Sequence, residues 1–186
     1  MMAKLPPFTA SGVLPIGDYE LNFNEVRASH LVVGDGSDHH WDTGWRRSLV
    51  DYAEILVNQL WHVGVADVFL DGSFVENKCH PNDIDGYFHC DAREIATGSL
   101  EDRLNQLDPH KVWTWKNASR RPYRGYPKGQ LPMWHVYRVE LWPHYHQVSG
   151  IADNRGNELL FPSAFRQQRQ SFEPKGIVKL VREGSK

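Results

Sequence analysis

An α+β fold is the fold class that the sequence predicts, and three observations lead to it. One long segment carries apolar residues at helical spacing, several short apolar segments have the length of strands, and turn-forming residues separate them. Neither an internal repeat nor a linker-like stretch interrupts the 186 residues. We therefore expect one domain over residues 1–186, in which helices pack on a small mixed or antiparallel sheet.

The composition is that of a globular protein with an ordinary charge balance. Apolar residues make up 40% and aromatic residues 12% of the chain, which excludes a disordered protein. A formal net charge of −2 gives no bulk attraction to nucleic acid, so any basic surface has to be local. Two cysteines without a Cys-x-x-Cys motif do not form a disulfide framework. The chain lacks a run of roughly 18 apolar residues and a signal-peptide start, so we expect a cytoplasmic protein without membrane contact.

The N-terminal segments predict an arm, a short helix and a loop. Residues 1–23 contain prolines and glycines that disfavour a helix, so we expect an extended N-terminal arm. Asn22 and Glu25 have the spacing of a capping box, which predicts a short helix over roughly 24–31. A polar loop follows at 34–43.

The most regular pattern of the chain predicts a long helix between Asp42 and Gly64. Asp42 or Thr43 can cap its N-terminus, and Gly64 can end it. A helix face built from apolar residues at steps of three and four packs against a core, so we expect no catalytic role for it. The residues at this spacing are Trp45, Leu49, Tyr52, Ala53, Leu56, Leu60 and Val63.

Short apolar segments predict the strands of the sheet. Residues 65–70 form a buried strand that leads into Gly72 and Ser73, and residues 83–89 form the next strand. The elements expected after these are a helix at 99–107, a strand at 112–115, a Pro/Gly-rich loop at 117–132, a strand at 134–142 ended by Pro143, a turn at 149–157, a short helix at 163–170 and a strand at 175–181.

The segment from Asp71 to Gly86 is the most informative about function. Asp83 follows Ser73 by ten residues, and Asp85 comes two residues later. Alternate residues of a strand point to the same face, so the two carboxylates are aimed at one point. Such a pair repels unless a cation lies between the groups or one of them is protonated. Mg²⁺, or Mn²⁺ in its place, binds carboxylate oxygens together with phosphate oxygens.

The turn before this pair has the residues of a phosphate-binding turn. Gly72 allows the backbone to approach a phosphate closely, and Ser73 offers a hydroxyl and a backbone N–H. Lys78 lies in the loop that follows, where it either neutralises phosphate charge or is solvated. Metal-assisted chemistry on a nucleoside triphosphate is the prediction, and a plain surface turn is the alternative.

This pattern resembles that of the DNA polymerase β superfamily of nucleotidyltransferases. Its motif is a hydrophobic residue, Gly and then Gly or Ser, followed after a gap by Asp, a hydrophobic residue, Asp or Glu, and another hydrophobic residue. The nine residues between Ser73 and Asp83 fall within the gap that this motif allows, and Asp83-Ile84-Asp85 matches the acidic part. Gly86 departs from the motif, although Tyr87 follows at once.

The chain resembles more closely one group of small, uncharacterised bacterial and phage proteins assigned to that superfamily. The similar segments lie at 14–17, at 71–75 with 81–85, and at 165–169 with 175–177, so the resemblance covers most of the chain. It implies a polymerase β-like nucleotidyltransferase fold and chemistry, and it implies no known substrate. Many minimal nucleotidyltransferases are toxin-like or related to phage defence, which agrees with a toxin–antitoxin or phage-related role.

The resemblance also implies a third carboxylate on a later strand. In the superfamily this group binds the metal that activates the nucleophile, and it can act as the base. Glu140 is the candidate, 55 residues after Asp85 in an apolar segment. Asp is the commoner residue at this position, and Glu has the longer side chain. Glu140 therefore either completes a site with Asp83 and Asp85 or forms an exposed pair with Arg138.

Two further sets of residues have chemistry of interest. The loop at 117–132 combines cations and tyrosines that suit a second substrate such as RNA, a nucleotide or pyrophosphate, unless the loop is merely solvated. Its residues are Arg120, Arg121, Tyr123, Arg124, Tyr126 and Lys128. Lys175 can reach a phosphate if the family-like ending holds. Among the ten histidines, the tightest pairs at 39–40 and 144–146 have no companion cysteine pair or His-Glu-x-x-His helix, so we do not expect zinc.

The expected function is that of a Mg²⁺-dependent nucleotidyltransferase. It moves the nucleoside monophosphate of ATP or another NTP to a hydroxyl of a protein, a tRNA or a small molecule. The predicted site consists of Gly72, Ser73 and Lys78 at the phosphates and Asp83, Asp85 and Glu140 at the metal ions. A catalytically degenerate nucleotide-binding or regulatory module is the alternative that Glu140 and Gly86 favour, and a metal-dependent phosphohydrolase is the third possibility.

Overall fold

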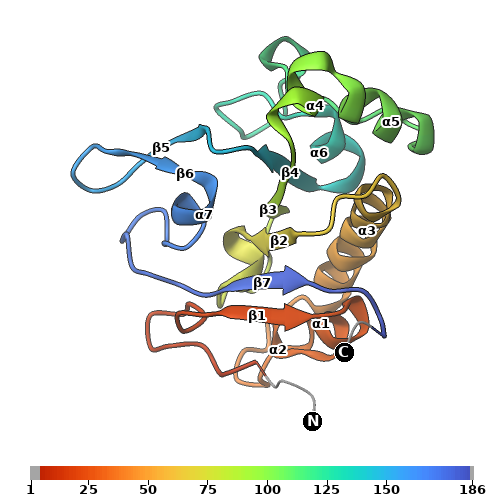
Figure 1. Cartoon of the computed structure of the whole chain (residues 1–186). Helices are drawn as coiled ribbons and strands as arrows, with labels where there is room; N and C mark the ends of the chain where they lie inside the picture. The colour runs from red at the N-terminus through yellow and green to blue at the C-terminus, as the bar shows by residue number, and fades with distance from the viewer. Residues whose placement is uncertain (1–4, 185–186) are drawn as a thin grey trace.

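A five-stranded mixed sheet lies at the centre of the computed structural model, which describes residues 5–184 (Figure 1). Predictions that fall on residues 1–4, including the start of the N-terminal arm, or on 185–186 lie outside the described residues. In chain order the elements are β1 (Asp18–Leu21), α1 (Phe23–Ala28), α2 (His30–Val33), α3 (Thr43–His62), β2 (Val68–Asp71), the 3₁₀ helix η1 (Gly72–Val75), β3 (Ile84–His89), α4 (Ala92–Thr97), α5 (Ser99–Leu107), the 3₁₀ helix η2 (Asn117–Ser119), α6 (Pro132–Tyr137), β4 (Val139–His144), β5 (Val148–Ala152), β6 (Glu158–Leu160), α7 (Phe161–Ala164) and β7 (Ile177–Leu180).

The strands of the main sheet follow the spatial order β1-β7-β2-β3-β4. The outer pairs, β1 with β7 and β3 with β4, are parallel, whereas β2 is antiparallel to both of its neighbours. A separate antiparallel hairpin of β5 and β6 projects to one side (Figure 1). Helices packed on a mixed sheet confirm the predicted α+β class.

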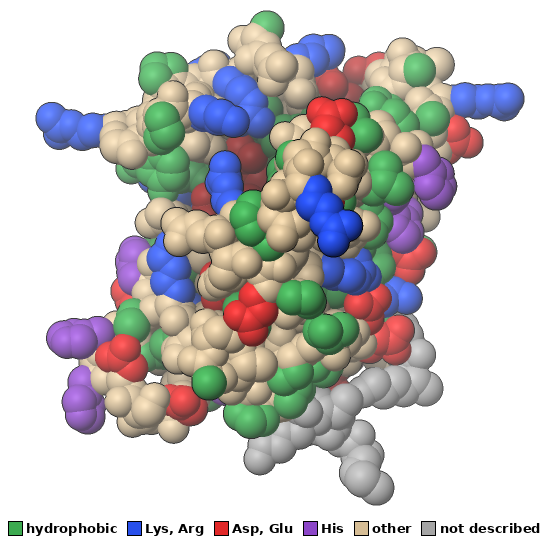
Figure 2. Space-filling view, turned by 90° about the vertical axis from the view of Figure 1, so that its left-hand side faces the viewer, with side chains coloured by type: hydrophobic (Ala, Val, Ile, Leu, Met, Phe, Trp, Pro, Cys, Tyr) green, Lys and Arg blue, Asp and Glu red, His purple; other side chains and the backbone are tan. Residues whose placement is uncertain are grey.

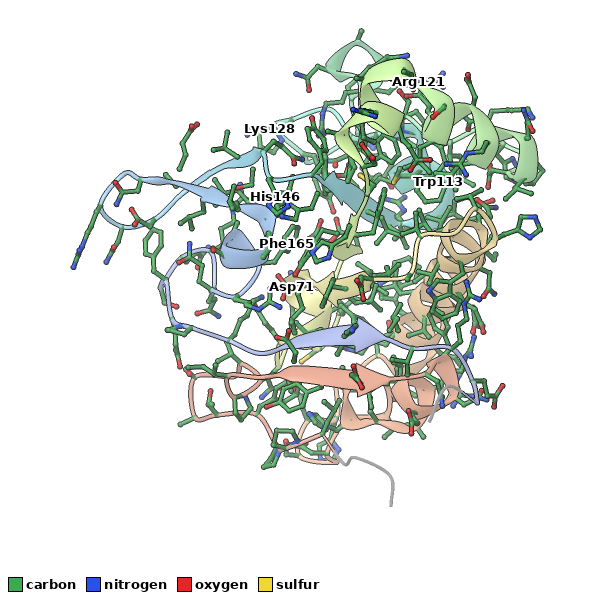
Figure 3. The ribbon with its side chains drawn as sticks, in the orientation of Figure 1. Asp71, Trp113, Arg121, Lys128, His146 and Phe165 are labelled. Carbon is green, nitrogen blue, oxygen red and sulfur yellow. The ribbon has the colours of Figure 1, made fainter. Side chains whose placement is uncertain are left out.

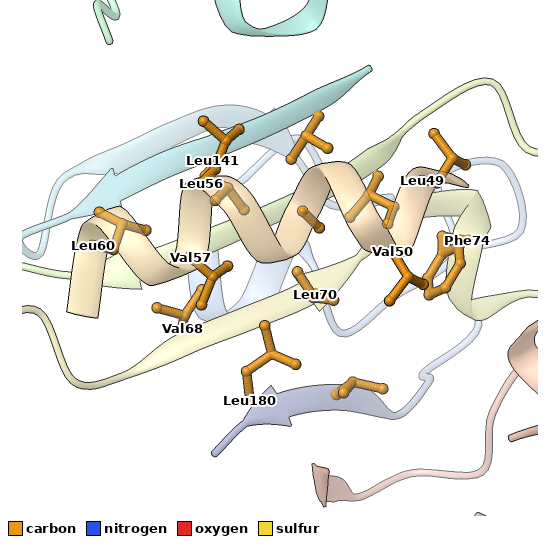
Figure 4. Close-up of a cluster of buried hydrophobic side chains, with 14 of the residues drawn as sticks. Leu49, Val50, Leu56, Val57, Leu60, Val68, Leu70, Phe74, Leu141 and Leu180 are labelled. Carbon is orange, nitrogen blue, oxygen red and sulfur yellow. The ribbon is translucent and has the colours of Figure 1, made fainter. Parts of the chain in front are cut away.

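Helix α3 covers one face of the sheet and confirms the predicted long helix. Asp42 caps it by accepting a hydrogen bond from the Trp45 N–H. Full burial of a Leu side chain stabilises a fold by roughly 1.5–3 kcal/mol, so the stripe of this helix is a main source of stability. The labelled side chains of this cluster in Figure 4 are Leu49, Val50, Leu56, Val57 and Leu60 of α3 with Val68, Leu70, Phe74, Leu141 and Leu180.

Alternation along the strands separates two faces of the sheet. Val68 and Leu70 of β2 belong to the core under α3, so Phe69 and Asp71 lie on the opposite face. There Phe69 stacks on Tyr87 of β3 with ring centroids 4.6 Å apart, and α7 packs against this pair. The face opposite α3 therefore carries a second apolar cluster and, at one end of β2, a carboxylate.

A buried arginine joins α3 to the loop after β2. Arg46 is 0% exposed, and its guanidinium donates to the backbone carbonyls of Leu31 at 2.6 Å and Phe74 at 2.8 Å. It also donates to the carbonyls of Glu76 at 3.1 Å and Lys78 at 2.5 Å. Burying a polar group is energetically costly unless the group forms hydrogen bonds. The Arg46 side chain binds one carbonyl of α2 and three carbonyls of the segment that follows β2.

The N-terminal elements differ from the prediction in two places. Residues 18–21, expected to belong to the extended arm, form strand β1 because they pair in parallel with β7. The helix expected over 24–31 is divided at Ser29, whose extended backbone (φ −78°, ψ 164°) ends α1 and begins α2. The capping box of Asn22 and Glu25 is confirmed.

The expected strand at 134–142 is wrong in its first half. Pro132 begins helix α6, where its missing N–H costs nothing, and Arg138 in the left-handed region (φ 54°) ends that helix before β4. Pro143 does not end the strand, because β4 lies at the edge of the sheet and needs no donor there. Residues 112–115 form no strand: the Trp113 backbone N–H and indole bind the side chains of Asn105 and Gln59.

The remaining predictions are confirmed with shifted ends or corrected. β2, β3, α5 and β7 confirm the elements expected at 65–70, 83–89, 99–107 and 175–181. The turn expected at 149–157 is largely the β5–β6 hairpin, the expected short helix is the earlier α7, and α4 was not predicted. None of the helices in residues 5–184 has the length and apolar character needed to cross a bilayer.

At Gly86 the backbone of β2 lies so close to β3 that no space remains for a side chain. A Cβ on Gly86 would overlap the Phe69 carbonyl oxygen and lie 2.9 Å from Leu141 Cδ2. Gly86→Ala is therefore expected to lower the free energy of unfolding by about 2–3 kcal/mol, measured by urea denaturation. The control is Gly44→Ala in α3, whose Cβ meets only Asp42 Oδ1 at 3.7 Å. Equal stability of the two variants would contradict this close approach.

Candidate functional site

The register of three strands places three carboxylates in a row. Asp71 of β2 is the direct partner of Asp85 on antiparallel β3, and Asp85 is the direct partner of Glu140 on parallel β4. Direct cross-strand partners point to the same face, which here is the face opposite α3. Asp83 lies two residues before Asp85 and so joins this face at the start of β3. Figure 3 labels Asp71 at the centre of the molecule.

Asp71 is the residue of this group that the sequence motif did not single out. It is 2% exposed, at the end of a strand whose four residues are all buried. The signal in the sequence that could have identified Asp71 is its position at the end of a buried apolar segment, directly before Gly72. Its alignment with Asp85 depends on the pairing of β2 with β3, which residue spacing alone does not reveal.

The four carboxylates destabilise one another's charged forms. The pKa of Asp85 is raised well above its usual range by burial and by the negative charges of Asp83, Glu140 and Asp71. Burial also raises the pKa of Asp83 and of Glu140. Asp85 accepts no hydrogen bond from any residue between 5 and 184 that would offset this cost. A protonated carboxyl or a bound cation relieves such repulsion.

Two of the carboxylates are oriented by hydrogen-bond donors from the segment before β4. The Trp134 indole N–H donates to Asp83 Oδ2 at 2.7 Å. The Leu131 backbone N–H donates to Glu140 Oε1 at 3.2 Å, and the Arg120 guanidinium lies 3.8 Å from the same oxygen. Glu140 is only 7% exposed. The alternative of an exposed strand carboxylate is therefore wrong.

Arg138 was the partner considered for Glu140 in that alternative. Its guanidinium carbon instead lies 3.9 Å from the centre of the Trp134 ring and 4.5 Å from that of Tyr123. Arg138 Nη2 also donates to the Tyr123 hydroxyl at 2.9 Å. The positive charge of Arg138 is thus held by aromatic rings beside Asp83, whose charged form it favours.

The turn after β2 lies directly against the acidic row. Gly72 has a φ of +70°, and a Cβ there would be 2.5 Å from Asp85 Oδ2. Glycine is required at this position both by the left-handed backbone and by the contact with the carboxylate. Ser73 is partly exposed in the same turn, which is the 3₁₀ helix η1. The predicted closeness of this turn to Asp85 is present at Gly72.

The two predicted lysines occupy different environments. Lys175 is 3% exposed, and its ammonium lies 3.2 Å from Asp71 Oδ1 and 2.6 Å from Glu76 Oε1 while donating to the Gly72 carbonyl at 3.3 Å. Two carboxylates share this one ammonium, and burial raises the pKa of Asp71 to about 7. Lys175 thus anchors the turn at its first residue, Gly72. Lys78 is exposed, and its charge favours the ionised form of Asp83.

The donor set of the site suits a hard cation, although its side chains are not gathered around one point. Within residues 5–184, no three His, Cys, Asp or Glu side chains stand closely enough to hold a metal ion. Asp85 and Glu140 are direct partners on paired strands, which lie about 4.8 Å apart, so these two carboxylates are neighbours. Carboxylate oxygens are the ligands that Mg²⁺ and Mn²⁺ prefer.

The surface around the carboxylates has mixed charge. Figure 2 shows Lys and Arg side chains close to acidic side chains on one side of the molecule. The loop before α6 contributes exposed Arg121, Arg124 and Lys128, whereas Arg120 turns inward to Glu140. Acidic side chains surrounded by basic ones can bind a cation and a polyanion together.

Because ionisation of the buried carboxylates is unfavourable, Asp85→Asn is expected to stabilise the protein above neutral pH. Because the pKa values of Asp71 and Asp85 are raised in the folded state, the protein takes up protons when it folds. The destabilisation caused by their ionisation is therefore absent below about pH 4 and grows as the pH rises towards 8. At pH 8 we expect Asp85→Asn to raise Tm by roughly 3–6 °C in thermal unfolding, with little change at pH 4. Glu158→Gln, an exposed carboxylate on β6, is the matched control. A lower Tm for Asp85→Asn at pH 8 would refute this electrostatic account.

Comparison with known proteins identifies one family. The chain matches the family described as "Family of unknown function (DUF6932)" over residues 6–181, a segment that contains every residue of the site. No curated protein and no solved structure matches the chain significantly. These comparisons carry no information on the chemistry of the site. Because the match extends over nearly the whole chain, the protein belongs to the family of unknown function DUF6932.

Proposed function

We propose that this protein is a Mg²⁺- or Mn²⁺-dependent nucleotidyltransferase. The observation that carries the proposal is the row of Asp71, Asp85 and Glu140 directly beside the turn that begins at Gly72. A group of carboxylates with raised pKa values, placed against a glycine turn and surrounded by cations, favours binding of a metal–triphosphate complex. The mixed sheet with Asp83 and Asp85 at the start of β3 also supports the polymerase β-like fold that the resemblance implies.

In this proposal each residue has a defined task. Asp83 and Asp85 hold the metal, and Glu140 completes the ligand set. When bound, the metal neutralises phosphate charge and acidifies the acceptor hydroxyl. Ser73 and the backbone of the turn donate to phosphate oxygens, and Lys78 adds positive charge from the exposed loop. Positioning and electrostatics dominate phosphoryl transfer, so a small domain is sufficient for the reaction.

The reaction forms one bond and breaks one. The acceptor oxygen attacks the α-phosphorus of the NTP, and the bond from that phosphorus to the oxygen bridging to the β-phosphate breaks. Pyrophosphate leaves with the bonding electrons, and the acceptor proton passes to Glu140.

A nucleotide-binding module without turnover is the second candidate function. It is favoured by the observation that the carboxylates are not gathered around one point among the described residues. Gly86, which also favoured it in the sequence, no longer does so, because the close approach of Phe69 explains a glycine there. A phosphohydrolase would share the carboxylates and use water as acceptor. A cytoplasmic location and a toxin–antitoxin or phage-related role belong to the same proposal.

Incubation with α-³²P-labelled NTPs and Mg²⁺ or Mn²⁺ distinguishes these functions. Transfer is expected to place label on an acceptor, hydrolysis releases free nucleoside monophosphate, and a binding module leaves the NTP intact. Asp83→Asn combined with Asp85→Asn is expected to reduce transfer by at least roughly a hundredfold, because metal ligands contribute more than the groups that orient them. Glu158→Gln serves as the control and is expected to leave transfer unchanged. Full transfer by the double variant would exclude the two aspartates as metal ligands.

A further inference from the structure

The loop from Arg120 to Leu131 carries three cations that no acidic group among the described residues neutralises. Arg121, Arg124 and Lys128 are all exposed, and their charged groups form no ion pair with residues 5–184. The protein as a whole is slightly acidic, with a net charge of −2, so this concentration of positive charge is a local feature. Unpaired cations clustered on one loop attract a polyanion.

Backbone hydrogen bonds give this loop a fixed shape. Arg121 and Gln130 form an isolated antiparallel bridge, with N–H to carbonyl distances of 2.9 and 2.8 Å. The Tyr126 N–H donates to the Tyr123 carbonyl at 3.1 Å and forms a turn at the tip. Arg120 donates from the base of the loop to the Gly129 carbonyl at 2.8 Å. The exposed cations therefore project from an ordered scaffold.

Two tyrosines at the tip of the loop pack beside the acidic row. The ring centroids of Tyr123 and Tyr126 lie 4.8 and 5.0 Å from that of Trp134, whose indole donates to Asp83. Tyr123 is 39% exposed, and Tyr126 is partly exposed. At its C-terminal end the loop reaches Glu140 through the Leu131 N–H. The loop thus places two aromatic rings near Asp83 and Glu140.

From this arrangement we propose that loop 120–131 binds a single-stranded nucleic acid and presents its terminal hydroxyl to the carboxylates. The inference deepens the proposed function by naming the acceptor class, and it rests on that function for the transfer step. The three cations contact phosphates, and Tyr123 and Tyr126 offer surfaces on which unpaired bases stack.

Other polyanions fit the loop less well. The bases of a duplex are stacked inside the helix and leave the tyrosines without partners. An acidic peptide satisfies the cations but has no aromatic rings to stack on Tyr123. A single strand of RNA or DNA uses both features and ends in a ribose or deoxyribose hydroxyl, which is the group that nucleotidyl transfer requires.

Binding is tested by fluorescence anisotropy with labelled single strands of roughly 12 nucleotides, without NTP and in EDTA. The probes are a single-stranded RNA, the DNA of the same sequence, the corresponding RNA duplex and a poly-glutamate peptide. These conditions separate binding from catalysis. Tight binding without transfer supports the loop assignment and counts against the proposed function. Transfer to another acceptor, without single-strand binding, overturns the loop assignment alone.

Variants of the loop test the contribution of the cations and the tyrosine separately. Arg121→Gln, Arg124→Gln and Lys128→Gln together are expected to reduce the slope of log Kd against log salt by about 2, because each phosphate contact to a single strand contributes about 0.7. The control combines Arg47→Gln, Arg93→Gln and Arg155→Gln, three exposed cations elsewhere, and leaves the slope unchanged. Tyr123→Leu is expected to weaken binding roughly tenfold, whereas Tyr123→Phe retains it.

Three results would overturn the inference. These are equal slopes for the two triple variants, equal affinity for the single strands and the duplex, and equal affinity for the poly-glutamate peptide. A comparison of the RNA and DNA arms identifies which sugar the loop prefers, and either preference supports a single-stranded acceptor. Thermal unfolding of every variant verifies that the exposed substitutions leave the fold intact.

Discussion

The register of β2, β3 and β4 is the constraint on which the rest of this structure depends. It aligns Asp71, Asp85 and Glu140 as direct cross-strand partners. A slip of one residue in any of these strands would turn its carboxylate towards α3 and an apolar side chain such as Leu70 away from the core. The packing under α3 therefore holds the negative charges together, although they repel.

Two buried cations fix the turn beside that row from opposite sides. Arg46 of α3 binds the carbonyl of Phe74 within the turn and that of Lys78 in the segment that follows it. Lys175 binds the Gly72 carbonyl and the carboxylate of Glu76. Neither cation needs a ligand to hold the turn in place. A phosphate bound there would meet donors already in position, which is the preorganisation that makes electrostatic stabilisation effective.

Local patterns predicted much of this arrangement and missed what depends on distant contacts. The apolar stripe of α3 and the spacing from Ser73 to Asp83 and Asp85 predicted a helix, two strands and the main acidic pair. Segment 112–115 has the composition of a strand, but side chains from other elements satisfy its polar groups. The alignment of Asp71 and the burial of Arg46 follow from strand pairing and helix packing, which no short sequence window contains.

A structural role alone does not account for the acidic row. Carboxylates that stabilise a turn accept hydrogen bonds and have lowered pKa values, as Asp42 does at the start of α3. Asp85 differs in both respects, because it accepts no hydrogen bond within residues 5–184 and its pKa is raised by its neighbours. Gly72, directly against it, leaves no room for a side chain that could cover the charge. A carboxylate without protein donors, placed beside three other carboxylates, suits a partner from outside the chain, and the divalent cation that we propose matches its sign and its oxygen ligands.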